Sequence, residues 1–282
     1  MTDAENVVLK TSLQYPLFKR GKVRDIYDLG DQLLIVSTDR ISSFDVVLPN
    51  GIPRKGEAIT RLSSYWFDET KGIIDNHIVK TVDPRTVLVK KAKMIPIEFV
   101  ARGYLYGAAW ENYKQGKTIC GIVLPRGLQK AEKLSRPILT PTTKAEVGHD
   151  LEITAKEVEQ KTGKDLARRI EDVTLRIYEK AAEKAEKNGI IVADTKLEFG
   201  ILNDKPILTD ELLTPDSSRF WPLDKYKVGE DQFSFDKQYV RDYLMSINWN
   251  RQPPAPTLPP NVVHETSEKY IEAYERLTSR KF

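Results

Sequence analysis

The chain reads IVADTKLEFG from Ile191 to Gly200. Side chains alternate between the two faces of a β-strand, so Asp194, Lys196 and Glu198 project from the same face of this stretch. The apolar residues that precede Asp194, and the helical segment before them, predict that the strand is interior. Three charges on one face of an interior strand are costly unless each is paired. The stretch therefore predicts a strand that lines a cleft, where a cation and phosphate complete the pairing.

A second acidic segment, PILTDE, follows from Pro206 to Glu211. If the connecting turn holds three residues, 203–205, Glu198 lies directly opposite Asp210, and the two carboxylates share one Mg²⁺ with nucleotide phosphates. If the turn holds two residues, these side chains lie on opposite faces and the metal argument fails. A solvated hairpin with an ordinary salt bridge is the remaining alternative. Spacing by itself does not decide between them.

Elsewhere the sequence pattern changes between strand and helix. The first half reads as a twisted antiparallel sheet covered by one helix, and the second half is richer in helix. The predicted segments are strands over 24–29 and 33–38, a helix over 57–71, strands within 73–102, helices over 108–115 and 164–187, a hairpin over 190–210, and helices over 236–245 and 266–277. We therefore expect an α+β fold.

Two closely associated lobes are expected, with a cleft between them. Residues 1–95 form an N-terminal β-rich lobe, and residues 96–282 form a mixed second lobe that includes the C-terminal helices. The proline-rich segment 252–260 is either a stiff spacer before the last helix or a polyproline ligand for a partner domain. We adopt the spacer as the prediction.

Composition narrows the possible functions. With 282 residues, 44 basic and 41 acidic, the net charge is +3, which argues against nucleic-acid binding by bulk electrostatics. The three histidines lie far apart and Cys120 is the one cysteine, so we expect neither a zinc site nor an intramolecular disulfide. The sequence contains no long apolar run and no signal-like segment, so we expect a cytoplasmic protein. Its chemistry should rest on carboxylates, lysines and arginines.

Two long segments resemble the signatures of a known family. VADTKLEFG, from Val192 to Gly200, and TDELLTPDSSRFW, from Thr209 to Trp221, are similar to those of the SAICAR synthetases. The similarity extends from Gly21 to the C-terminal helix. It implies a two-lobed ATP-grasp or kinase-like architecture, in which residues 1–95 cover the nucleotide and residues 96–282 hold substrate and metal.

The resemblance also implies a reaction. The family condenses L-aspartate with carboxyaminoimidazole ribonucleotide (CAIR) at the expense of ATP, giving SAICAR, ADP and phosphate in de novo purine biosynthesis. A carboxylate acylates poorly because oxide is a poor leaving group, so the implied path first phosphorylates the CAIR carboxylate. ATP and Mg²⁺ are the implied cofactors, and CAIR, aspartate and ATP are the implied small-molecule partners.

Thirteen side chains are assigned to the site by this similarity or by local pattern. Two of them bind both metal and ATP, four others contact ATP, and the rest contact substrate or serve the chemistry. The assignments are Glu198 and Asp210 for Mg²⁺ and ATP; Lys22 and Arg24 for phosphate; Lys90 and Met94 for adenine; Arg102 and Arg219 for the ribonucleotide; Arg40, Asp45 and Lys144 for the substrate side; and Lys196 and Asp194 for catalysis. Asp194 orients either Lys196 or the attacking groups.

Several of these assignments have alternative interpretations. Lys22 and Arg24 are expected on one strand face after a flexible glycine, and a short basic face is weak evidence by itself. Arg102 shares a strand face with Glu98, which also fits a structural ion pair. The loops 39–45 and 139–146 are equally typical of polar turns or helix caps. The signature also departs from the family at positions 106 and 108, where tyrosine and alanine replace a small residue and a serine.

Three rival functions can be distinguished. A related kinase would phosphorylate a sugar or small alcohol in the same cleft, and its ADP release would not depend on aspartate. A regulatory protein that has lost catalysis is disfavoured because Lys196, Glu198 and Asp210 are present. An anion- or RNA-binding module is disfavoured by the balanced charge and by the lack of interleaved aromatic and basic residues.

Overall fold

The computed structural model describes residues 7–144 and 150–282. One five-stranded antiparallel sheet has the order β1-β2-β3-β7-β6. Its strands are β1 (Leu17–Arg20), β2 (Arg24–Asp28), β3 (Gln32–Ser37), β6 (Ile78–Asp83) and β7 (Thr86–Lys90). The predicted hairpin over 24–38 is confirmed, with Asp28 opposite Leu33. The first half of the chain therefore forms the expected antiparallel sheet.

The second sheet carries the acidic hairpin. Its order is β11-β10-β8-β9, and β12 also pairs with β10. The strands are β8 (Lys93–Tyr104), β9 (Lys133–Thr143), β10 (Ile190–Leu202), β11 (Lys205–Thr209) and β12 (Ser218–Pro222). Because β10 pairs with three strands, it is interior, as its apolar start predicts. A third, two-stranded sheet pairs β4 (Arg40–Ser43) with β5 (Val46–Gly51).

The predicted helices are present with small shifts at their ends. They are α1 (Lys55–Glu69), α2 (Ala108–Lys114), α4 (Lys164–Lys187), α5 (Gln238–Ser246) and α6 (Pro260–Thr278), and a short α3 (Ala155–Thr162) precedes α4. The last helix begins six residues before the expected start at 266, because Pro260 occupies its first turn, where a missing N–H costs nothing. Among the described residues, no helix combines the length and apolarity needed to cross a bilayer.

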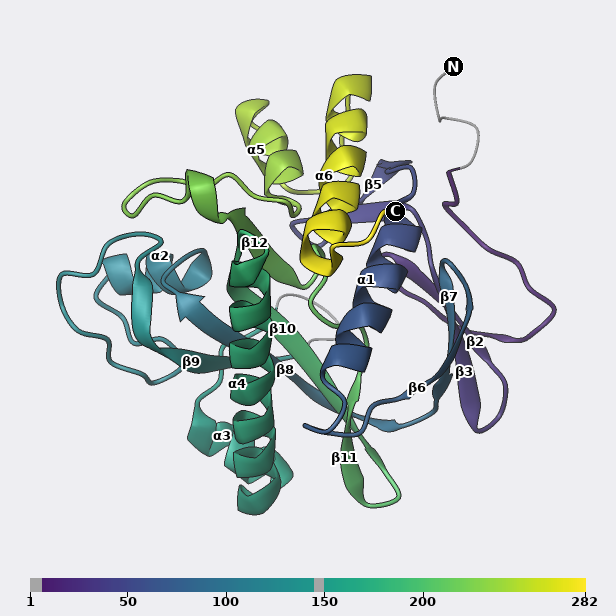
Figure 1. Ribbon diagram of the computed structural model, residues 1–282, viewed down its shortest axis with the longest axis horizontal. Coiled ribbons are helices and arrows are strands. Elements are labelled where there is room, and N and C mark those ends of the chain that lie inside the picture. The colour runs from purple at the N-terminus through teal and green to yellow at the C-terminus, as the bar shows by residue number, and fades with distance from the viewer. Residues whose placement is uncertain (1–6, 145–149) are drawn as a thin grey trace.

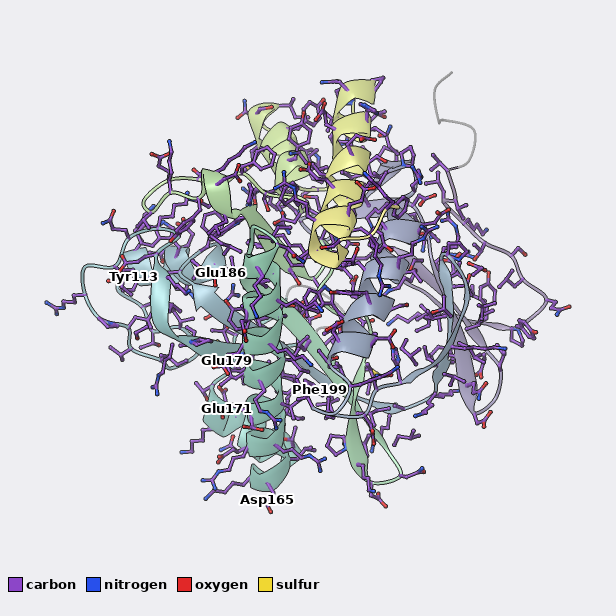
Figure 2. All side chains as sticks on the ribbon, in the orientation of Figure 1. Tyr113, Asp165, Glu171, Glu179, Glu186 and Phe199 are labelled. Atoms are coloured by element: carbon purple, nitrogen blue, oxygen red, sulfur yellow. The ribbon has the colours of Figure 1, made fainter. Side chains whose placement is uncertain are left out.

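Helix α4 is amphipathic, and its apolar face packs against the second sheet. Ile170, Val173 and Ile177 are buried against the second sheet. Glu171 and Glu179, labelled in Figure 2, are exposed on the same helix. In Figure 1, α4 stands in front of β8 and β10, and the first sheet lies at the right of the view. The hydrophobic face thus covers the side of the sheet opposite the charged residues of β10.

The two sheets are joined by hydrogen bonds as well as by the chain. The segment before β6 runs beside β11: the backbone N of His77 donates to the Leu208 carbonyl at 3.0 Å, and the N of Leu208 donates to the Asp75 carbonyl at 2.9 Å. The hydrophobic core is also shared, since Trp66 of α1 and Phe199 of β10 belong to one cluster. These contacts bring β2 of the first sheet close to the end of β11.

The C-terminal helices pack across the expected lobe division. Helix α6 lies beside α1, and Tyr270 of α6 packs with Ile59 of α1. The proline-rich segment leads from α5 to α6, and its Leu258 is buried beside β5, where its backbone N donates to the Asn50 side chain at 2.6 Å. A spacer fits this arrangement. The division at residue 95 stays a prediction.

Candidate active site

The centre of β10 holds a cluster of acids and lysines. Lys196 Nζ lies 3.1 Å from Glu198 Oε1 and 2.6 Å from Glu98 Oε1. Glu198 is 2% exposed, and its other carboxylate oxygen accepts from Lys144. Burial lowers the pKa of Lys196, but Glu198 and Glu98 outweigh it and raise that pKa above its ordinary value. Lys196 is therefore held as a cation between the carboxylates of Glu98 and Glu198.

Glu98 is a member of this cluster that the sequence did not reveal. It lies directly opposite Glu198 on β8. The alternative interpretation that Glu98 pairs with Arg102 is wrong, because residues four apart on a strand are about 13 Å apart. Alternation along β8 places the Glu98 and Arg102 side chains on the face that carries the charged residues of β10. Their partners are determined by the pairing of β8 with β10. Burial, partly opposed by Lys196, raises the pKa of Glu98.

The hairpin register differs from the one on which the metal prediction depended. Leu202 pairs with Lys205, so the turn has two residues, Asn203 and Asp204, with φ values of 49° and 58°. Positive φ at both positions is what a tight type I′ turn requires. Glu198 therefore faces Thr209. The three-residue turn, and with it a direct Glu198–Asp210 pair in the ladder, is wrong.

Asp210 nevertheless joins the same cluster by a different route. It follows the last residue of β11 with φ at 64°, which takes it out of the strand alternation. Its Oδ1 lies 2.6 Å from Arg24 Nη2. Burial by itself would raise the pKa of Asp210, but Arg24, Lys196 and Lys144 outweigh it and hold the pKa below its usual range. Glu198 and Asp210 thus act on the same two lysines although they are not opposite one another.

These carboxylates suit a hard divalent cation by chemistry. Carboxylate oxygens are the ligands that Mg²⁺ prefers, and nucleotide phosphates commonly supply the others. Across residues 7–144 and 150–282, no group of three or more acidic, histidine or cysteine side chains is arranged to hold a metal ion. Glu198 and Asp210 are two such carboxylates, and their role as Mg²⁺ ligands stays a prediction.

A second cluster lies at the other end of the same strand face. Asp194, 3% exposed, is flanked in the ladder by Arg102 on β8 and Arg219 on β12. Its Oδ2 lies 2.8 Å from Arg102 Nη1 and 2.6 Å from Arg219 Nη1, and Arg102 Nε donates to Thr140 Oγ1 at 2.8 Å. Two guanidinium groups share the Asp194 carboxylate, and their forked N–H donors suit an anion. The described contacts of Asp194 orient these arginines rather than Lys196.

The residues predicted in the first sheet separate into two groups. Arg24 begins β2 and reaches Asp210, whereas Lys22 lies in the turn before β2, so the shared strand face is wrong. Lys22 Nζ instead lies 2.5 Å from Asp45 Oδ1 on the tip of the β4–β5 hairpin. Arg40 is buried, donates to the carbonyls of Lys22 and Gly21 at 3.0 Å, and pairs with a buried aspartate. These contacts give Arg40 a structural role, and its predicted substrate contact stays a prediction.

The predicted adenine segment lies where the chain passes between the sheets. Lys90 ends β7, and Met94, 44% exposed, is the second residue of β8. Lys144 follows β9 and reaches Glu198, while Ala145 and Glu146 at the end of the predicted substrate loop lie outside the described residues. The nucleotide contacts of Lys90 and Met94 stay predictions.

Comparison with known proteins identifies the family. A family model described as SAICAR synthetase matches residues 17–256. A phosphoribosylaminoimidazole-succinocarboxamide synthase from Thermodesulfovibrio yellowstonii is 52% identical over 98% of this chain and 100% of its own. The SAICAR synthase of Saccharomyces cerevisiae, solved in complex with SAICAR, is 41% identical, covers 98% of this chain and 99% of its own, and superposes with a TM-score of 0.90.

A further solved structure is a SAICAR synthetase in complex with ADP. It is 25% identical, covers 94% of this chain and 98% of its own, and has a TM-score of 0.72. The α+β fold with antiparallel sheets is shared with the SAICAR synthases that superpose on it. On the extent of these matches, the chain belongs to the SAICAR synthetase family.

Proposed function

We propose that this chain condenses L-aspartate with CAIR at the expense of ATP, giving SAICAR, ADP and phosphate. The observation that carries the proposal is the order of charges along β10. Asp194 with its two arginines, and Lys196 with Glu198, lie on one strand face, and residues two apart on a face are about 7 Å apart. An anionic nucleotide and the end of a triphosphate would therefore be bound side by side.

The proposed path uses these two clusters in turn. Arg102 and Arg219 orient CAIR so that its carboxylate faces the γ-phosphorus of ATP. The carboxylate oxygen attacks phosphorus, the bond to the bridging oxygen breaks, and ADP leaves with that electron pair. The aspartate amine then attacks the acyl carbon, phosphate leaves, and the amine loses a proton. Lys196, held as a cation by two carboxylates, offsets the charge that develops on the transferred phosphoryl group.

The remaining roles complete the nucleotide site. Glu198 and Asp210 would hold Mg²⁺, which when bound neutralises charge on the β- and γ-phosphates. In the two-lobed ATP-grasp or kinase-like arrangement that we infer, the first sheet covers ATP, with Lys22 and Arg24 toward phosphate and Lys90 and Met94 toward adenine. A cytoplasmic location belongs to the same proposal.

A substrate-omission assay tests this function. ADP release is measured with ATP, CAIR and aspartate together and with each left out in turn, and the product is identified by mass. We expect sustained ADP release and SAICAR formation when all three substrates are present. Sustained ADP release without aspartate would support a kinase instead, and binding of ATP without turnover would support a regulatory protein.

A further inference from the structure

Arg219 lies in a slot whose walls are Gly107, the ring of Tyr106 and the Asp194 carboxylate. The guanidinium carbon is 5.7 Å from the centre of the Tyr106 ring. A Cβ at position 107 would approach Arg219 Nη2 to 2.7 Å and would displace the guanidinium from its place. The φ of 61° with ψ of −135° at this residue is also one that only glycine adopts readily. The buried Nε of Arg219 has no hydrogen-bond partner among the described residues.

The Tyr106 ring is itself held from three sides. It packs edge to face with the Trp221 ring, with centroids 5.1 Å apart and planes at 74°. Lys130 Nζ lies 5.5 Å from the ring centre, and the Tyr106 hydroxyl donates to Asp231 Oδ1 at 3.0 Å. Lys130 also contacts Asp231. Tyr106 is 6% exposed, so the ring presents a fixed face to Arg219.

We propose that Tyr106 is a positioning residue for the nucleotide acceptor: its ring fixes the plane of the Arg219 guanidinium. This inference rests on the proposed function, in which Arg219 contacts the ribonucleotide. Asp194 restrains one end of the guanidinium, at Nη1, and leaves rotation about that contact open. The aromatic face opposes this rotation because it attracts the cation. The Tyr106 hydroxyl, engaged with Asp231, acts on the loop that carries Asp231.

The attraction of the ring face can be varied without changing the ring's shape. Replacing Tyr106 by phenylalanine keeps the negative face and removes the hydroxyl. Replacing it by phenylalanines with one, three and five ring fluorines removes that face stepwise. The Arg219 side chain is 23% exposed, and a cation–π contact between the exposed and the desolvated extremes corresponds to about tenfold in an equilibrium constant. We therefore expect the KM for CAIR to rise progressively to about tenfold across the series. The kcat and the KM values for ATP and aspartate should change less than about twofold.

Tyr104 is the matched control. It is also 6% exposed and also meets Trp221 edge to face, at 5.5 Å, but the cation recorded over its ring is Lys133. The same fluorinated residues at position 104 should leave the KM for CAIR unchanged at a similar loss of thermal stability. Equal KM increases at both positions, or no increase at position 106, would overturn the positioning role.

Arg219→Lys separates this inference from the function on which it rests. If Arg219→Lys raises the KM for CAIR while fluorination at position 106 does not, the positioning role is wrong and the assignment of Arg219 stands. If Arg219→Lys leaves the KM for CAIR unchanged, the assignment of Arg219 is wrong and the inference falls with it. If both Arg219→Lys and fluorination at position 106 raise the KM for CAIR, the assignment of Arg219 and the positioning role of Tyr106 are both supported.

Discussion

Replacing Glu198 by glutamine tests the acid–lysine cluster most directly. Glutamine keeps the shape of the side chain and removes its charge. Losing one such electrostatic contact to a developing transition state costs about 3–4 kcal/mol, or about 10²- to 10³-fold in rate. We therefore expect Glu198→Gln to lower kcat/KM for ATP by at least about 10²-fold, and to raise the Mg²⁺ concentration needed for half-maximal rate.

The structure also predicts that this variant stays folded. Lys196 keeps Glu98 at 2.6 Å, and Lys144 is 42% exposed, so neither lysine is left buried without a partner. The assay is ADP release with all three substrates at several Mg²⁺ concentrations, with thermal unfolding followed in parallel. Glu179→Gln, on the exposed face of α4, is the control and should match the parent chain. A Glu198→Gln rate within threefold of the parent would refute the assignment.

Three further outcomes follow from the geometry. Arg102→Lys should raise the KM for CAIR by about tenfold in initial-rate measurements, with the KM for ATP unchanged, because one ammonium cannot span Asp194 and Thr140 as the forked guanidinium does. Gly103→Ala should lower the free energy of unfolding by about 1–3 kcal/mol in urea titrations, because its Cβ would meet the Tyr178 hydroxyl at 1.9 Å; an unchanged midpoint would contradict the close packing of α4 on β8. Burial lowers the pKa of His77 from 6.5 to about 4, so between these pH values the unfolded chain binds a proton that the folded chain does not. His77 should therefore contribute a loss of about 3 kcal/mol in stability as pH drops from 6.5 to 4, and urea titrations across this range should show a shallower fall for His77→Gln than for the parent chain.

Most of the elements could be predicted from local pattern. The helix over 164–187 is predicted from its regular apolar face and from Asn188 and Gly189, which follow its last residue. The first hairpin followed from alternation around a turn with Gly30. Such signals depend on residues that are close in the sequence, so they can be interpreted without knowledge of the rest of the fold.

The acidic hairpin shows where local reasoning was insufficient. Asn203 and Asp204 are residue types that tolerate positive φ, and this signal pointed to a two-residue turn. The metal prediction had depended on three. Asp210 joined the cluster all the same, because its own positive φ and the approach of Arg24 from the first sheet redirect the carboxylate. No spacing rule within the hairpin contains that information.

The sequence by itself determined the family signature, the α+β class and the presence of three charges on one face of β10. The tertiary structure decided which groups meet: Glu98 with Lys196, and Arg102 and Arg219 with Asp194. The physical reason is the range of the interactions. Alternation and helical periodicity are set by bonds along the chain, whereas an ion pair between strands depends on register and on sheet packing, which arise from burial of the whole core.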